Sequence, residues 1–136
     1  MTEFTAHCEC DLPAGTDRVW QALTDPTELA AWFWPPSFGT TVTVDGTTWR
    51  IAAATPAIAA SGSVLATEPP NSLLRSWRWD GEELVTTVAI RLASTAAGCH
   101  ITVDHAGFPE QQAADDHVVG WRDCLARLSS RLSIAS

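Results

Sequence analysis

Two histidines have the residue type and the predicted placement for acid–base chemistry. His105 alternates with Ile101 and Val103, so all three side chains face one side of a predicted strand. His117 lies on a predicted helix. If the two side chains converge, they could move protons at an enolisable carbonyl, because imidazole titrates near neutral pH. Alternatively, each is a core histidine that finds a hydrogen-bond partner and stays neutral.

Small or polar residues share one face of the same helix with His117. Ala113, Gly120 and Cys124 complete this stripe at steps of four and three. A glycine inside a helix costs about 1 kcal/mol relative to alanine, so Gly120 has a reason to be small. Either the stripe packs tightly on a sheet, or it forms the ceiling of a ligand cavity.

Tryptophan is abundant, with seven residues, and tyrosine is absent. Trp77 and Trp79 share one face of a predicted strand, and Trp121 lies on the helix. Such side chains either fill a core or form the wall of a cavity for a planar ligand.

Arg75 lies on the same face of this predicted strand as Trp77 and Trp79. Pointing inward, it needs a buried carboxylate or a ligand's acid group; if the strand twists or bulges there, it is solvated.

Other kinds of site lack their sequence signals. Cys8-x-Cys10 does not have the ligand spacing of a zinc site, and the four cysteines are expected to be reduced, buried thiols. We find no glycine-rich phosphate loop, nucleophile elbow or His-x-x-x-His pair. We therefore expect no metal and no cofactor.

Charge and hydropathy exclude further classes of partner. The net charge is -8 and all eight basic residues are arginine. No basic patch is available for phosphates, so we expect no nucleic-acid partner. The start of the chain lacks a signal peptide and no apolar run could span a membrane, so a cytoplasmic protein is expected.

The pattern of elements predicts an α+β fold in one domain, residues 1–136. We expect a strand at 2–12, short helices at 16–24 and from Pro26 to before Pro35, and a long helix at 109–132. Thr16 or Asp17 is a candidate N-cap for the first helix and Asp25 for the second. Between the helices, two-residue periodicity predicts six antiparallel strands at 41–44, 47–53, 61–68, 73–79, 84–92 (with Leu84 facing inward) and 99–105.

The long helix carries an apolar stripe that a curved sheet must cover, and a pocket between the two is expected. The stripe consists of Ala114, Val118, Trp121, Leu125, Leu128 and Leu132. Two apolar segments, 32–38 and 52–60, are candidates for the mouth of this pocket, for a partner patch, including one in a homodimer, or for a cover over a sheet edge.

Three motifs in this order resemble the START-like helix-grip superfamily, and within it the branch named after the activator of Hsp90 ATPase. They are Pro13-x-x-x-Asp17-x-Val19-Trp20-x-Ala22-Leu23-Thr24-Asp25-Pro26-x-x-Leu29-x-x-Trp32, then Gly62-x-Val64-x-x-x-Glu68-Pro69-Pro70-x-x-Leu73-x-x-x-Trp77, and Val103-x-His105-x-Gly107-Phe108 with His117-x-x-Gly120-Trp121-x-x-x-Leu125-x-x-Leu128. The resemblance implies a helix-grip fold with a cavity between sheet and last helix. Relatives bind lipids, sterols or polyketides there, and some cyclise polyketides.

The leading hypothesis is therefore binding of a small hydrophobic, aromatic or polyketide-like molecule. One alternative is a cyclase-type or aromatase-type enzyme with His105 or His117 as acid or base. Another is a chaperone-associated interaction module. The expected ligand-binding residues are Trp77, Trp79, Val88, Ile90, Val103, His105, His117, Gly120 and Trp121.

Overall fold

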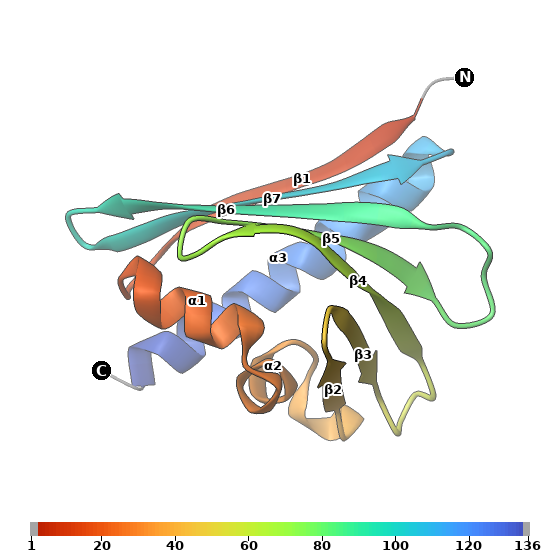
Figure 1. Ribbon diagram of the computed structural model, residues 1–136, viewed down its shortest axis with the longest axis horizontal. Coiled ribbons are helices and arrows are strands. Elements are labelled where there is room, and N and C mark those ends of the chain that lie inside the picture. Colours follow the sequence, from red (N-terminus) through yellow and green to blue (C-terminus); the bar gives the residue numbers. More distant parts are fainter. Residues whose placement is uncertain (1–2, 135–136) are drawn as a thin grey trace.

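The computed structural model describes residues 3–134 of the chain. In this part, a curved antiparallel sheet of seven strands wraps around one long helix, in the order β1-β7-β6-β5-β4-β3-β2 (Figure 1). This arrangement confirms the predicted α+β helix-grip fold. The elements are β1 (Phe4–Leu12), α1 (Thr16–Thr24), α2 (Pro26–Trp32), the 3-10 turn η1 (Pro36–Phe38), β2 (Thr41–Asp45), β3 (Thr48–Ala52), β4 (Ala59–Glu68), β5 (Ser72–Trp79), β6 (Thr86–Thr95), β7 (Gly98–Phe108) and α3 (Gln111–Ile134).

The helix α3 crosses the concave side of the sheet, with α1 and α2 beside its C-terminal half (Figure 1). It begins at Gln111 and not at Pro109, because its first turn is closed by the Ala114 N–H, which donates to the Glu110 carbonyl over 3.3 Å. The predicted apolar stripe is buried except for Val118, which is half-buried. Its buried members are Ala114, Trp121, Leu125, Leu128 and Leu132.

Within residues 3–134, no helix has the length and apolar character needed to cross a membrane.

The strand β6 starts later than predicted. Leu84, expected on its inner face, lies in the preceding loop with 38% of its surface exposed. The pairing of β5 with β6 ends at Trp77 and Thr86. On its other edge, β5 pairs with β4, and this pairing continues to Trp79, which lies opposite Ala60. Leu84 therefore has no neighbouring strand, although its position in the alternating pattern is correct.

The two short helices differ in how they start. The residue before α1 is Gly15, whose lack of a side chain leaves this end without a side-chain cap, so the prediction of Thr16 or Asp17 was wrong. Asp25 caps α2 as predicted: its carboxylate accepts hydrogen bonds from the N–H groups of Thr27 and Glu28, at 2.9 and 3.2 Å.

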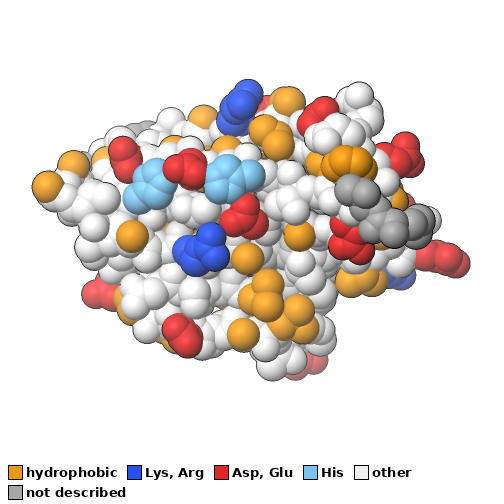
Figure 2. All heavy atoms as spheres, turned by 90° about the horizontal axis from the view of Figure 1, so that it is seen from above, with side chains coloured by type: hydrophobic (Ala, Val, Ile, Leu, Met, Phe, Trp, Pro, Cys, Tyr) orange, Lys and Arg blue, Asp and Glu red, His pale blue; other side chains and the backbone are white. Residues whose placement is uncertain are grey.

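The outer face of β1 and β7 carries histidines among acidic side chains (Figure 2). His7 contacts Asp104 and Glu9 through its two ring nitrogens, and His100 contacts Asp11 and Glu9. Hydrogen bonds to these carboxylates raise the pKa of both histidines. All four cysteines are free thiols, and Cys10 is the one that is only half-buried.

Replacing Asp25 by alanine should lower the free energy of unfolding by about 1 kcal/mol, because two N–H groups at the start of α2 lose their acceptor. Urea denaturation measures this change. The matched control is Asp17→Ala, in the first turn of α1, which caps no helix end and should cost less than about 0.5 kcal/mol. Equal losses of unfolding free energy in the two variants would show that capping by Asp25 adds no stability of its own.

Candidate functional site

A pocket of about 380 Å³ opens between α3, β5 and the segment that follows α2. Aromatic rings form most of its wall, and two histidines lie among them. The aromatic side chains are Phe33, Trp34, Phe38, Trp77, Trp79 and Trp121; the other lining residues are Pro35, His105, Asp116, His117, Gly120, Asp123, Cys124 and Arg127. A concave, mostly apolar site with a few polar groups is the usual form of a small-molecule pocket.

Six of the nine predicted ligand-binding residues line this pocket. They are Trp77, Trp79, His105, His117, Gly120 and Trp121. The other three, Val88, Ile90 and Val103, are at most 1% exposed and lie outside the lining. They belong to the same hydrophobic core as Leu125 and Leu128 of α3, which fill this part of the fold. Strand parity identified their face correctly but carried no information about depth.

Gly120 lies where α3 borders the pocket, and close packing against the sheet does not explain its lack of a side chain. A Cβ atom built on it would have no heavy atom within 4 Å outside its immediate helix surroundings. Tight contact with a strand, one of the two explanations open from the sequence, is therefore wrong. The missing side chain leaves open space on the pocket side of the helix.

The segment after α2 supplies a wall that the sequence indicated only as a candidate mouth. Trp34 stacks on Trp79, with ring centroids 6.1 Å apart and planes 11° apart. Phe33 meets Trp121 edge-on, at 5.6 Å. Trp32 turns the other way and donates from its indole N–H to the Ala22 carbonyl over 2.9 Å. The first three residues of the segment, Trp32 to Trp34, are thus part of the interior, whereas Pro36 and Ser37 are exposed.

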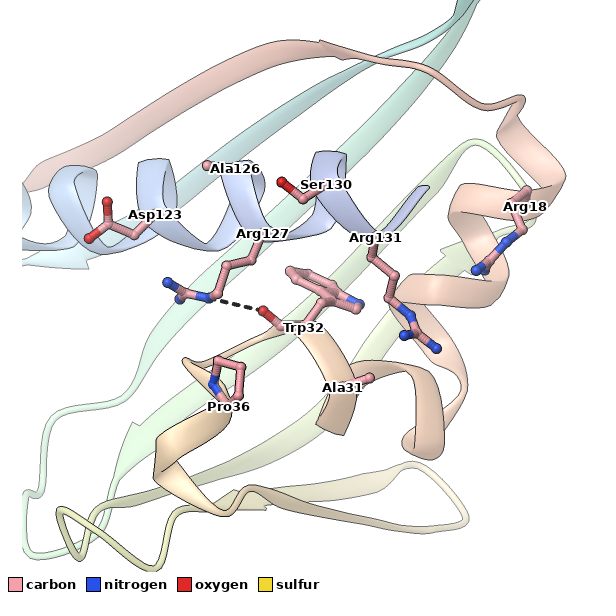
Figure 3. A pocket seen from close by; sticks show the side chains of 9 residues that line it. All are labelled: Arg18, Ala31, Trp32, Pro36, Asp123, Ala126, Arg127, Ser130 and Arg131. Atoms are coloured by element: carbon pink, nitrogen blue, oxygen red, sulfur yellow. Dashed lines mark hydrogen bonds between the residues drawn. The ribbon is translucent and has the colours of Figure 1, made fainter. Parts of the chain in front are cut away.

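Arg127 of α3 holds this segment in place (Figure 3). Its guanidinium donates to the carbonyls of Trp32 and Phe33, at 3.1 and 2.8 Å. The Cys124 thiol donates to the Phe33 carbonyl as well, at 3.0 Å. These carbonyls at the end of α2 have no N–H donor further along the helix, and side chains of α3 donate to them instead. Neither Cys124 nor Arg127 was predicted as a ligand-binding residue.

The two histidines converge, with ring centroids 5.0 Å apart. The Nδ1 atom of His105 accepts a hydrogen bond from the Trp121 indole N–H over 3.1 Å. An indole nitrogen can only donate, so the proton of His105 sits on Nε2 and is donated to the Thr86 hydroxyl oxygen at 2.6 Å. The Thr86 hydroxyl in turn donates to the Trp77 carbonyl at 3.3 Å.

His117 has the opposite tautomer for the same reason. Its Nε2 atom accepts from the Trp79 indole N–H over 3.2 Å, so Nδ1 carries the proton and donates to the Ala113 carbonyl at 2.8 Å. In each histidine, a tryptophan N–H donates to the unprotonated nitrogen, and the protonated nitrogen donates to an oxygen. Both rings thus have both nitrogens bonded inside the protein.

Burial above all, together with the neighbouring His117 and Arg75, lowers the pKa of His105 to about 3. His105 is therefore neutral across the physiological pH range.

Within residues 3–134, no three histidine, cysteine or acidic side chains are placed to hold a metal ion.

A second, larger hollow of about 610 Å³ lies on the other side of Arg127, between α2 and the C-terminal half of α3 (Figure 3). Two arginines of its lining bind a neighbouring carboxylate: Glu28 accepts from Arg18 at 3.1 Å and from Arg131 at 3.2 and 3.3 Å. These two arginines therefore already have an anionic partner within the protein.

The comparisons with solved structures identify the same fold. Protein MLL2253 from Mesorhizobium loti matches with a TM-score of 0.84 at 22% identity, over 98% of this chain and 99% of that one. DynU16, from the dynemicin biosynthetic locus, matches with a TM-score of 0.83 at 24% identity, over 97% of this chain and 48% of its own. The Aha1 protein from Colwellia psychrerythraea, a dimer in solution, matches with a TM-score of 0.79 at 16% identity, over 95% of this chain and 96% of that one.

A comparison with curated protein sequences found no match. The sequence does match the family described as "Activator of Hsp90 ATPase homolog 1-like protein" over residues 13–133. This stretch includes all three motifs on which the resemblance was based, and it covers most of the chain. The protein therefore belongs to the activator of Hsp90 ATPase homolog 1-like family.

Proposed function

We propose that the protein binds a small hydrophobic, aromatic molecule in the pocket between α3 and β5. The observation that carries this proposal is the lining itself: six aromatic side chains around a volume of about 380 Å³. Pockets for small molecules typically enclose about 300–1,000 Å³. A planar ligand would stack on these rings, and offset or edge-on contacts with them would add to the free energy of burial.

The polar groups of the pocket favour binding over catalysis by the histidines. A general base needs a free lone pair, and a general acid needs a proton that points at the substrate. In His105 and His117 both nitrogens are occupied, each by one indole and one oxygen. For either histidine to act on a substrate, a tryptophan would first have to give up its own hydrogen bond. Affinity through shape and ring contacts requires no such change.

A panel of aromatic compounds tests the proposal. DynU16, which shares this fold, comes from a biosynthetic locus, so biosynthetic small molecules are a sensible part of the panel. The first probe is N-phenyl-1-naphthylamine, which is neutral, aromatic and fluorescent, and which reports an apolar site by its emission. Quenching of the pocket tryptophans provides an independent signal.

Gly120→Leu should abolish binding without loss of stability. The open space at Gly120 accepts the side chain, and the helix gains up to about 1 kcal/mol from losing a glycine. The leucine side chain would occupy the volume that a ligand needs, so the affinity for the probe should fall at least tenfold, equivalent to about 1.4 kcal/mol or more. Titration by fluorescence, together with urea denaturation, measures both effects.

Two variants are the controls for this experiment. Gly120→Ala makes the same change in helix propensity with a single methyl group and should retain binding within about threefold, which is less than 1 kcal/mol. Val119→Leu adds bulk at the adjacent position, whose side chain is 57% exposed, and should change nothing. If wild-type protein shows no saturable binding across the panel, or if Gly120→Leu binds as well as wild type, the proposed pocket is wrong.

The histidines should titrate in two opposite ways. His105 should remain neutral from pH 8 to 5, because its pKa is about 3, whereas His7 and His100 should have midpoints above the usual 6.5. The folded pKa of His105 lies below its unfolded value, so its contribution to stability is full above pH 6.5 and is lost as pH falls toward 3. The contributions of His7 and His100 have the opposite sign: they are present below pH 6.5 and are lost as pH rises through their raised midpoints.

NMR titration of the histidine ring signals checks this prediction, and the exposed pair provides the internal comparison. A midpoint for His105 between pH 6 and 7 would mean that one of its nitrogens is free to exchange protons. That result would favour the acid–base alternative.

A further inference from the structure

Arg75 is buried, with 6% of its surface exposed. The sequence left open whether a bulge would expose it to solvent, and β4 does contain an irregularity between Val64 and Ala66, beside the pair that Val64 makes with Arg75. The strand β5 nevertheless directs the Arg75 side chain inward. Among residues 3–134, no carboxylate forms a salt bridge with it, and its Nε atom has no hydrogen-bond partner.

The surroundings of Arg75 contain further unmatched donors. It lines a small chamber of about 10 Å³ together with Trp49 and Trp77, and apolar side chains from α2, β2 and β3 complete the wall. The indole N–H groups of Trp49 and Trp77 are buried and have no partner within the described residues. Three of the four such side-chain atoms thus belong to residues that line this one chamber.

All three of these groups are donors, and an indole N–H or a guanidinium cannot accept a hydrogen bond. The Arg75 Cζ atom lies 5.1 Å from the centroid of the Trp49 ring, which offers partial compensation through a cation–π contact. Burial lowers the pKa of Arg75 to about 10, which still leaves it positively charged at neutral pH. A buried charge without a counter-ion is strongly unfavourable, so this site favours a negatively charged acceptor.

The other arginines near the interior are balanced by the chain itself. Glu28 binds Arg18 and Arg131, and backbone carbonyls bind Arg127. Arg75 has the deepest position of these four and has neither kind of partner among the residues described. The imbalance is therefore local to the chamber.

We propose that this chamber is a binding site for one small monovalent anionic group, held by the Arg75 guanidinium and the indole N–H groups of Trp49 and Trp77. A volume of about 10 Å³ admits about one water-sized particle, which suits a halide or one end of a carboxylate. Phe33 and Trp77 line both the chamber and the aromatic pocket. The acceptor could therefore be a free ion or the acid group of a pocket ligand. A water molecule could pair with the donors but would leave the charge unmatched.

The free-ion source is tested by thermal denaturation at constant ionic strength, with gluconate exchanged stepwise for bromide. Wild-type protein should gain stability along a saturation curve, since an ion that binds only the folded state raises the melting temperature. Arg75→Met should lose this dependence. Arg78→Met, one position before Trp79 and exposed on the outer face, should keep it and thereby corrects for general salt effects.

Trp49→Phe keeps a ring beside the guanidinium and removes one N–H. It should require roughly tenfold more bromide for the same stabilisation, because a hydrogen bond to an ion is lost. Since this variant retains the charge and most of the volume, it also tests the proposal if Arg75→Met fails to fold. An equal bromide response in wild type, Trp49→Phe and Arg75→Met would overturn the free-ion source.

The carboxylate source is tested with naphthoate and its neutral analogue naphthamide. If the acid group occupies the chamber, naphthoate should bind at least roughly tenfold more tightly, and Trp49→Phe and Arg75→Met should remove that preference while leaving naphthamide unaffected. No bromide response together with equal binding of the two compounds would overturn the anion site. Naphthamide or N-phenyl-1-naphthylamine binding that Gly120→Leu abolishes would still support the aromatic pocket, so the two proposals fail separately.

Discussion

The indole ring of Trp77 lies at the centre of the interior, and the arrangement on both sides of β5 depends on its contacts. The ring centroids of five aromatic side chains lie within 6.5 Å of its own: Phe33, Trp49, Trp79, His105 and Trp121. One long helix cannot fill the whole concave side of a seven-stranded sheet, so large rings occupy the remaining space. Trp77 divides that space into the aromatic pocket toward α3 and the small chamber beside Arg75.

The four histidines show how strongly their surroundings determine the chemistry of one residue type. On the outer face of the sheet, carboxylates bind both nitrogens of His7 and His100, and the charged form is favoured. On the inner face, indole donors bind His105 and His117, and burial keeps His105 neutral. The pair inside thus serves to orient Trp79 and Trp121 in the pocket wall. Both indoles are therefore fixed by hydrogen bonds within the protein as well as by packing.

Much of the fold followed from local signals. Alternation of apolar residues predicted the strands, and the four-and-three spacing predicted the buried stripe of α3, because both depend on the repeat of the backbone alone. The Asp25 cap was predictable for a similar reason: the carboxylate and its two N–H partners lie within three residues. The bounds of α1 were predicted correctly, but its cap was not, since Gly15 precedes α1 without any side-chain signal.

The sequence by itself determined which residues face inward, including the two histidines and the tryptophans of β5, but it left the direction of Arg75 open. Only the tertiary structure decided what each of them meets there. The depth of Val88, the open space at Gly120 and the convergence of His105 with His117 depend on the curvature of the sheet and on the path of the chain after α2. These features join residues far apart in the chain, whereas periodicity reports only the neighbours of each residue along its own strand or helix.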